Sequence, residues 1–240
     1  MYRLLFIALL WACQSPTQEA AGGGSVFEEQ PVAEIQDPQE IPVPEGYNIL
    51  ERVDGDLDKD GIEEAVVAYN TAEIDEGSFK NVERDLIIYK QQAGKWVKWK
   101  SSLQALYGSR DGGMMGDPYD TMSIEIGILN IQHFGGSSWK WSVTDKYRYQ
   151  DNELFLIGYT STSGAPCEYF VNADFNVSTG KIIIEKEWEN CDDENAENKK
   201  VSETSLVQGL KVTLQNRHDK RIHIVTPKEK LEVFVSTGPN

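Results

Sequence analysis

Apolar and polar residues alternate along much of the chain from residue 47 onward, with the period of two that is typical of β-strands. The clearest example is 139–149, where tryptophan, valine and tyrosine occupy most odd positions and polar residues fill the even ones. Such a strand buries one face in an antiparallel sheet and exposes the other. We therefore expect Trp139 and Trp141 to share a buried face.

Further strand-like runs recur, separated by turn residues. They are 64–69, 85–89, 96–100, 123–126, 129–134, 154–159, 168–175, 181–188, 209–214, 221–225 and 231–235. The Ala-Gly pair within 91–95 predicts a hairpin between the second and third of these runs. One helical turn is expected near 101–107. The pattern predicts an all-β fold of antiparallel sheets, arranged as a sandwich, a barrel or a partial propeller.

The N-terminus carries an export signal. Residues 4–12 are all apolar, but a helix of this length rises only about 14 Å, too short to span a bilayer. We therefore interpret residues 1–12 as a signal peptide rather than a membrane span. Leu10, Ala12 and Cys13 resemble the lipobox of bacterial lipoproteins, which implies cleavage before Cys13 and acylation of this cysteine. Ordinary secretion and an apolar core segment are the alternatives.

The next stretch, 13–46, has the composition of a flexible tether. It holds five of the nine prolines, seven acids and no Lys or Arg. Low hydrophobicity and charge of one sign do not repay the entropy cost of ordering. The sequence therefore predicts a disordered tether over 13–46 and one β-rich domain over 47–240.

Charge and lipidation limit the partners. The formal net charge of −16 argues against nucleic acid, because phosphate binding needs a basic surface. An acylated Cys13 implies attachment to the membrane through lipid. Gln14, directly after that cysteine, favours the outer membrane. We therefore expect a lipid-anchored envelope protein that is periplasmic or surface-exposed.

The other two cysteines, Cys167 and Cys191, are expected to pair. Export places them in an oxidising space, where an even pair favours a disulfide. If 178–180 is a three-residue hairpin loop, opposed residues of the flanking strands sum to 358, as 167 and 191 do. The two cysteines would then face each other across the ladder. Two free thiols are the alternative.

The segment 56–64 is the most specific local signal for a site. It offers oxygen ligands for a metal from four side chains and one backbone carbonyl: Asp56, Asp58, Asp60, Glu64 and the carbonyl of Ile62. Gly61 permits the sharp turn, and hard oxygen ligands in a loop of this kind suit Ca²⁺. An EF-hand is excluded, because Val67 stands where its bidentate Glu belongs. An acidic surface turn without metal is the alternative.

This spacing, followed by a hydrophobic strand, resembles the calcium loops of integrin-type FG-GAP and VCBS repeats, which form β-propeller blades. The resemblance covers only this part of the chain, and it implies the same five ligands. The chain departs from the family in having a single loop, and in carrying Glu64 where Asp is usual. The larger pattern is similar to uncharacterised exported proteins of Bacteroidetes-type bacteria, which implies no activity.

A glycine-rich segment, 108–120, is a possible ligand loop. Its charged residues are Arg110, Asp111, Asp117 and Asp120. Loops often carry function, although a merely mobile connection is the simpler interpretation. No catalytic motif occurs, and His133 is expected to be a partly buried imidazole. The favoured function is a non-catalytic binding role toward an envelope protein or a glycan. The alternatives are an envelope hydrolase using the carboxylates of 108–120 and a structural subunit of an envelope complex.

Overall fold

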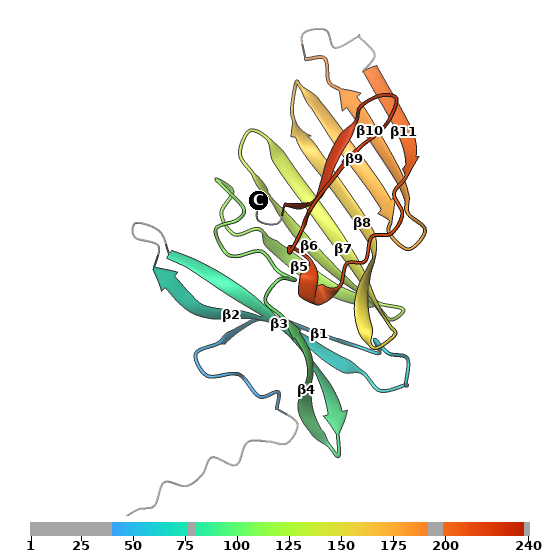
Figure 1. The fold of residues 1–240 in the computed structure, drawn as a ribbon. Helices are drawn as coiled ribbons and strands as arrows, with labels where there is room; N and C mark the ends of the chain where they lie inside the picture. The colour runs from blue at the N-terminus through green and yellow to red at the C-terminus, as the bar shows by residue number, and fades with distance from the viewer. Residues whose placement is uncertain (1–39, 76–79, 192–198, 238–240) are drawn as a thin grey trace, which may run out of the picture. The chain divides into compact units, whose positions relative to one another are not determined.

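The computed structural model describes residues 40–75, 80–191 and 199–237, which form three antiparallel β-sheets (Figure 1). This confirms the all-β fold class. Within these ranges, no helix is long and apolar enough to cross a membrane. The predicted signal peptide, Cys13, Gln14 and most of the predicted tether lie outside the described residues.

The first sheet is a four-stranded meander in which each strand pairs with the next. Its strands are β1 (Asn48–Gly55), β2 (Glu64–Asp75), β3 (Lys80–Gln92) and β4 (Lys95–Ser102). Ala93 and Gly94 join the last two strands with φ angles of 50° and 77°. Two residues with positive φ match the right-handed twist of a hairpin, so the predicted hairpin is confirmed.

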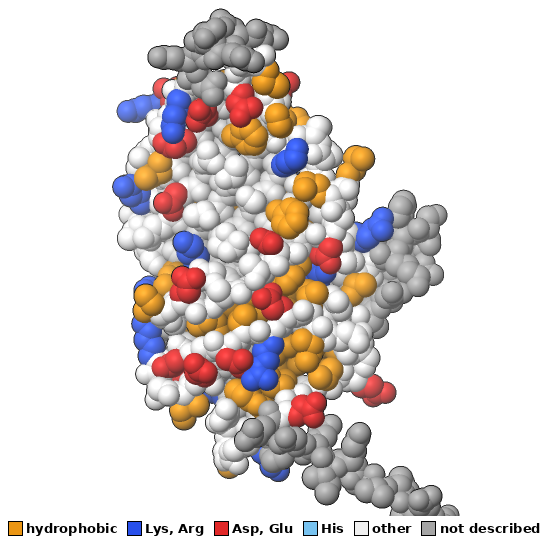
Figure 2. All heavy atoms as spheres, turned by 180° about the vertical axis from the view of Figure 1, so that it is seen from behind, with side chains coloured by type: hydrophobic (Ala, Val, Ile, Leu, Met, Phe, Trp, Pro, Cys, Tyr) orange, Lys and Arg blue, Asp and Glu red, His pale blue; other side chains and the backbone are white. Residues whose placement is uncertain are grey.

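The second sheet has seven strands that are also in sequence order (Figure 1). They are β5 (Tyr119–Glu125), β6 (Ile128–Gly136), β7 (Lys140–Gln150), β8 (Glu153–Ala165), β9 (Tyr169–Asn176), β10 (Lys181–Trp188) and β11 (Lys199–Leu206). The sheet is open, with β5 and β11 at its edges. Seen from behind, acidic and basic side chains are interspersed with apolar ones (Figure 2).

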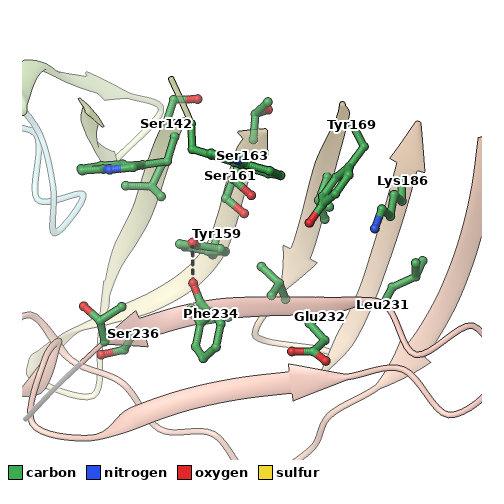
Figure 3. A pocket seen from close by; sticks show the side chains of 18 of the residues that line it. Ser142, Tyr159, Ser161, Ser163, Tyr169, Lys186, Leu231, Glu232, Phe234 and Ser236 are labelled. Atoms are coloured by element: carbon green, nitrogen blue, oxygen red, sulfur yellow. Dashed lines mark hydrogen bonds between the residues drawn. The ribbon is translucent and has the colours of Figure 1, made fainter. Parts of the chain in front are cut away.

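The third sheet is a C-terminal hairpin of β12 (Arg221–Val225) and β13 (Glu232–Thr237). It lies against one face of the seven-stranded sheet, where the Tyr159 hydroxyl donates a hydrogen bond to the Phe234 carbonyl at 3.0 Å (Figures 1 and 3). The hairpin covers part of that face of the seven-stranded sheet and leaves the rest accessible.

Two predicted local elements are wrong. Residues 209–214 form no strand, because their only ladder contact is an isolated bridge between Phe155 and Thr213. The segment leads instead into a short 3-10 helix, Leu214–Asn216. The turn expected near 101–107 is a series of bends rather than a helix.

The packed part of the chain begins earlier than residue 47. Ile41 is only 5% exposed, and it belongs to an apolar cluster with Tyr69 and Tyr89. The Tyr89 hydroxyl donates a hydrogen bond to the Pro42 carbonyl at 3.0 Å. The last residues of the predicted tether are therefore part of the fold.

The β9–β10 hairpin has a different register from the predicted one. Asn176 pairs with Lys181, so the loop is 177–180 and opposed residues sum to 357. Gly180 has a φ of 77° and takes the left-handed position, as expected. The Gly180 amide donates to the Asn176 carbonyl at 2.9 Å, which closes the loop with one more residue than the sequence suggested.

Candidate metal centre

The acidic loop joins β1 to β2 and is anchored in the protein interior. Gly55 and Glu64 form the last pair of the ladder before the loop. Leu57, between them, is buried in the main hydrophobic core together with residues of the seven-stranded sheet. Gly61 has a φ of 88°, in the left-handed region that favours glycine, which agrees with the sharp turn predicted there.

Three of the predicted carboxylates converge. Asp56, Asp58 and Glu64 each place one oxygen within 4.8 Å of the others. Ca²⁺ binds oxygen at roughly 2.3–2.6 Å, so two oxygens on one ion lie at most about 5 Å apart. The three oxygens are therefore close enough to coordinate a single ion.

Glu64 is the least exposed of these acids, at 1%. Its Oε2 accepts hydrogen bonds from the amides of Leu57 at 2.8 Å and Asp58 at 3.4 Å. Burial raises the pKa of Glu64 despite the Leu57 hydrogen bond, and the charge of Asp58 raises it further. The folded chain therefore holds this carboxylate in a site that disfavours its charge, and a nearby cation would relieve that cost.

The side chain of Lys90 enters the cluster from β3. Tyr89 pairs with Ala65, which brings the next residue of β3 beside Glu64. The Lys90 ammonium forms an ion pair with Asp58, and its Nζ lies 3.4 Å from Glu64 Oε1 and 3.7 Å from Asp60 Oδ2. Burial alone would lower the pKa of Lys90, but its hydrogen bond to Asp58 and the charge of Glu64 outweigh burial and raise it.

One ammonium does not neutralise the loop. Residues 56–64 hold five acids and one cation, Lys59, so the formal charge of the loop with Lys90 added is still −3 when every acid is ionised. Asp58 Oδ1 is also buried, with no hydrogen-bond partner among the described residues. A buried carboxylate oxygen without a hydrogen-bond partner, in a loop with excess negative charge, is a suitable ligand for a hard cation.

The other two predicted ligands are placed differently. Asp60 lies outside the converging group, and its Oδ1 accepts a hydrogen bond from the Ile62 amide at 2.8 Å. The Asp56 carboxylate accepts hydrogen bonds from the amides of Asp60 at 3.1 Å and Gly61 at 3.0 Å, which curls the loop around it. Metal ligation by Asp60 and by the Ile62 carbonyl stays a prediction.

The carboxylates of the 108–120 loop mainly hold its own backbone. Asp111 accepts a hydrogen bond from the Gly108 amide at 2.7 Å, and Asp117 accepts one from the Tyr119 amide at 2.9 Å. Asp117 also forms an ion pair with the buried guanidinium of Arg84. Arg110 and Asp120 are exposed. No contact in this loop favours hydrolysis, so that alternative stays a prediction.

The disulfide between Cys167 and Cys191 is confirmed, with Cα atoms 5.2 Å apart. The cysteines lie just beyond the ends of β9 and β10, where the Glu189 amide donates to the Glu168 carbonyl at 3.1 Å. Cys167 has a φ of 64°, which departs from strand geometry. The pairing was therefore predicted correctly from a register that is wrong by one residue.

His133 is buried, as its sequence context suggested. Its Nε2 accepts a hydrogen bond from the Tyr107 amide at 3.4 Å. Burial lowers the pKa of His133 to about 4, and the charge of Asp145 opposes that shift only in part. The imidazole is therefore neutral at physiological pH and belongs to the interior.

Comparison with known proteins found no matching family model, curated protein or solved structure. We therefore infer function from the residues of this chain alone.

Proposed function

We propose that this chain is an exported, lipid-anchored binding protein without catalytic activity, in which a Ca²⁺ ion fixes the loop between β1 and β2. The convergence of Asp56, Asp58 and Glu64 is the observation that carries the metal part of this proposal. The ion's role is structural, because Leu57 ties the same loop to the main core.

Calcium suits this loop better than smaller hard cations. Mg²⁺ demands near-ideal octahedral geometry, whereas Ca²⁺ accepts irregular shells of six to eight oxygens. Two backbone amides of the loop already hold the Asp56 carboxylate, which restricts its movement into an octahedral arrangement. Extracellular calcium modules bind at about 10⁻⁴–10⁻³ M, which is sufficient outside the cytosol.

Thermal unfolding with calcium or with a chelator tests the metal site. At ten times the Kd, binding to the folded state alone adds about 1.4 kcal/mol, or roughly 3–6 °C for a domain of this size. Asp58→Asn should abolish the response. Asp54→Asn is the matched control, because Asp54 is exposed and pairs with Arg52 outside the cluster. A wild-type midpoint that millimolar Ca²⁺ does not move contradicts the assignment.

The anchor is supported by the apolar run before Cys13 and by the disulfide, which is favoured in oxidising compartments. Mass spectrometry of the N-terminal peptide from the membrane fraction tests it. We expect acyl chains on Cys13, and release of a Cys13→Ser variant from the membrane. An unmodified N-terminal peptide in the wild type rules out the lipid anchor.

A further inference from the structure

A large cleft lies between the seven-stranded sheet and the C-terminal hairpin (Figure 3). Its volume is about 1080 Å³, slightly above the roughly 300–1,000 Å³ that is typical of small-molecule sites. Protein interiors are close-packed and contain few voids larger than a water molecule. A space of this size is therefore a surface feature open to a ligand rather than a gap in the core.

The sheet register shows how the floor of the cleft is built. Trp141, Ser163, Val171 and Lys186 are neighbours in one row across β7, β8, β9 and β10. All four line the cleft. Nearer the four-stranded sheet, the same face carries fully buried residues such as Phe175. Along these strands, the same face of the seven-stranded sheet therefore belongs to the core near the four-stranded sheet and lines the cleft farther from it.

Aromatic side chains form one wall of the cleft. Trp139 is 44% exposed, and its ring centroid lies 4.9 Å from that of Tyr169. The Tyr169 centroid is in turn 6.4 Å from that of Trp188. The burial expected for Trp139 from the sequence is therefore wrong. An exposed aromatic ring contributes little hydrophobic stabilisation. A ligand that packs against the ring would remove its surface from water and gain that stabilisation.

Polar groups stand beside these rings. The Lys186 ammonium lies 3.5 Å from the Tyr169 ring centroid and 4.7 Å from that of Trp188, so its described contacts are with rings rather than carboxylates. Figure 3 shows Ser161 and Ser163 on the floor near Tyr169 and Lys186, and Glu232 on the hairpin opposite. The lining therefore offers hydroxyls and charges of both signs within one aromatic enclosure.

This combination favours a saccharide over other ligand classes. A sugar ring presents C–H groups on its face and hydroxyls around its edge, so it needs an aromatic platform and several polar partners together. A purely apolar ligand would cover the Lys186 ammonium without giving it a polar partner, at a cost in binding free energy. A polyanion would be repelled by the chain's net charge of −16 and by acidic side chains in the cleft, among them Glu232.

We propose that this cleft binds a saccharide chain, with a sugar ring stacked on Trp139 and Tyr169 and its hydroxyls hydrogen-bonded to Lys186 and to the serine hydroxyls of β8. The proposal rests on the binding role argued above and names its ligand class and site. It makes Trp139 the main contact, because it is the most exposed ring in the cleft.

A glycan array probed with the purified protein tests the proposal, using neutral, N-acetylated and acidic oligosaccharides. At least one glycan should bind, and Trp139→Ala should weaken its binding at least tenfold in a titration. Lys186→Gln should also weaken it. Phe134→Ala is the matched control, because Phe134 is an exposed aromatic residue outside the cleft, and it should bind within twofold of wild type.

Binding to no glycan, or binding that Trp139→Ala leaves unchanged, overturns the proposal. Binding of peptides instead of glycans also overturns it. Circular dichroism of each variant checks that the fold is retained. If Cys13 is acylated and calcium binds but no glycan does, only this inference fails. If a glycan binds while anchor and ion are both absent, the binding role holds and only the lipid anchor and the calcium site proposed above fail.

Discussion

Replacing Lys90 with methionine separates the roles of the ammonium and of the metal. The Lys90 ammonium is the counter-ion that the chain itself supplies to Asp58 and Glu64. Methionine keeps most of the apolar stem but removes the charge. Without metal, the variant leaves two largely buried carboxylates with no cation beside them. With Ca²⁺ present, the ion supplies the missing positive charge.

The size of the effect follows from burial. Removing one partner of a buried ion pair costs about 3–5 kcal/mol. The Lys90 and Asp58 side chains are 18% and 13% exposed, which favours the lower end of that range. We therefore expect Lys90→Met to lose about 3 kcal/mol in a chelator, or roughly 6–12 °C in the melting midpoint. Saturating Ca²⁺ should reduce the loss to below about 1 kcal/mol, as for an exposed pair.

Urea unfolding of the wild type and the variant, each with chelator and with Ca²⁺, gives the required comparison. The packing of Lys90 against Trp99, 4.2 Å from Nζ to the ring centroid, is lost in both conditions. It therefore cancels in the difference. Lys95→Met, at the exposed first position of β4, should change little in either condition. A Lys90→Met loss that is the same with and without Ca²⁺ would refute metal binding beside Lys90.

Three further predictions concern the folded domain. Replacing Cys167 and Cys191 with serine should cost about 3.5 kcal/mol in urea unfolding, and an unchanged midpoint would contradict this. Unfolded His133 gains its proton near pH 6.5 and the folded form only near 4, so His133 should contribute a loss of about 3 kcal/mol as the pH drops through that window. Burial also lowers the pKa of His218 to about 4, so His133→Gln should reduce the fall without removing it, and a fall as large as in the wild type would count against this. Asp145→Asn should lower the free energy of unfolding by about 3–5 kcal/mol in the same assay, because the fully buried Arg217 donates two hydrogen bonds to Asp145, at 2.6 and 3.0 Å. A loss below about 1 kcal/mol would mean that this ion pair contributes little to stability.

Local patterns were sufficient where the structure depends on nearby residues. Alternation identified most strands, and the Ala93-Gly94 turn fixed its hairpin. The cysteines were paired correctly although the register was not, because a shift of one residue leaves the strand ends within disulfide reach. The acidic spacing correctly brought Asp56 and Asp58 together but not Asp60, whose carboxylate accepts a hydrogen bond from the Ile62 amide instead.

Long-range pairing set the limits of prediction. Lys90 reaches the acidic loop only because the register of β2 and β3 places Tyr89 against Ala65, and no local signal gives that register. Alternation assigned Trp139 to a buried strand face, but Trp139 precedes β7 and is 44% exposed beside the cleft under the C-terminal hairpin, which pairs far along the chain. Ile41 was assigned to the tether because its burial partners, Tyr69 and Tyr89, lie on distant strands.

Isothermal titration of the chelator-treated protein with Ca²⁺ measures whether the loop between β1 and β2 binds one calcium ion. We predict one site per chain, with a Kd no weaker than about 10⁻³ M, that Asp58→Asn removes and Asp54→Asn retains. The absence of a binding isotherm in the wild type, or one that Asp58→Asn leaves unchanged, would contradict the account.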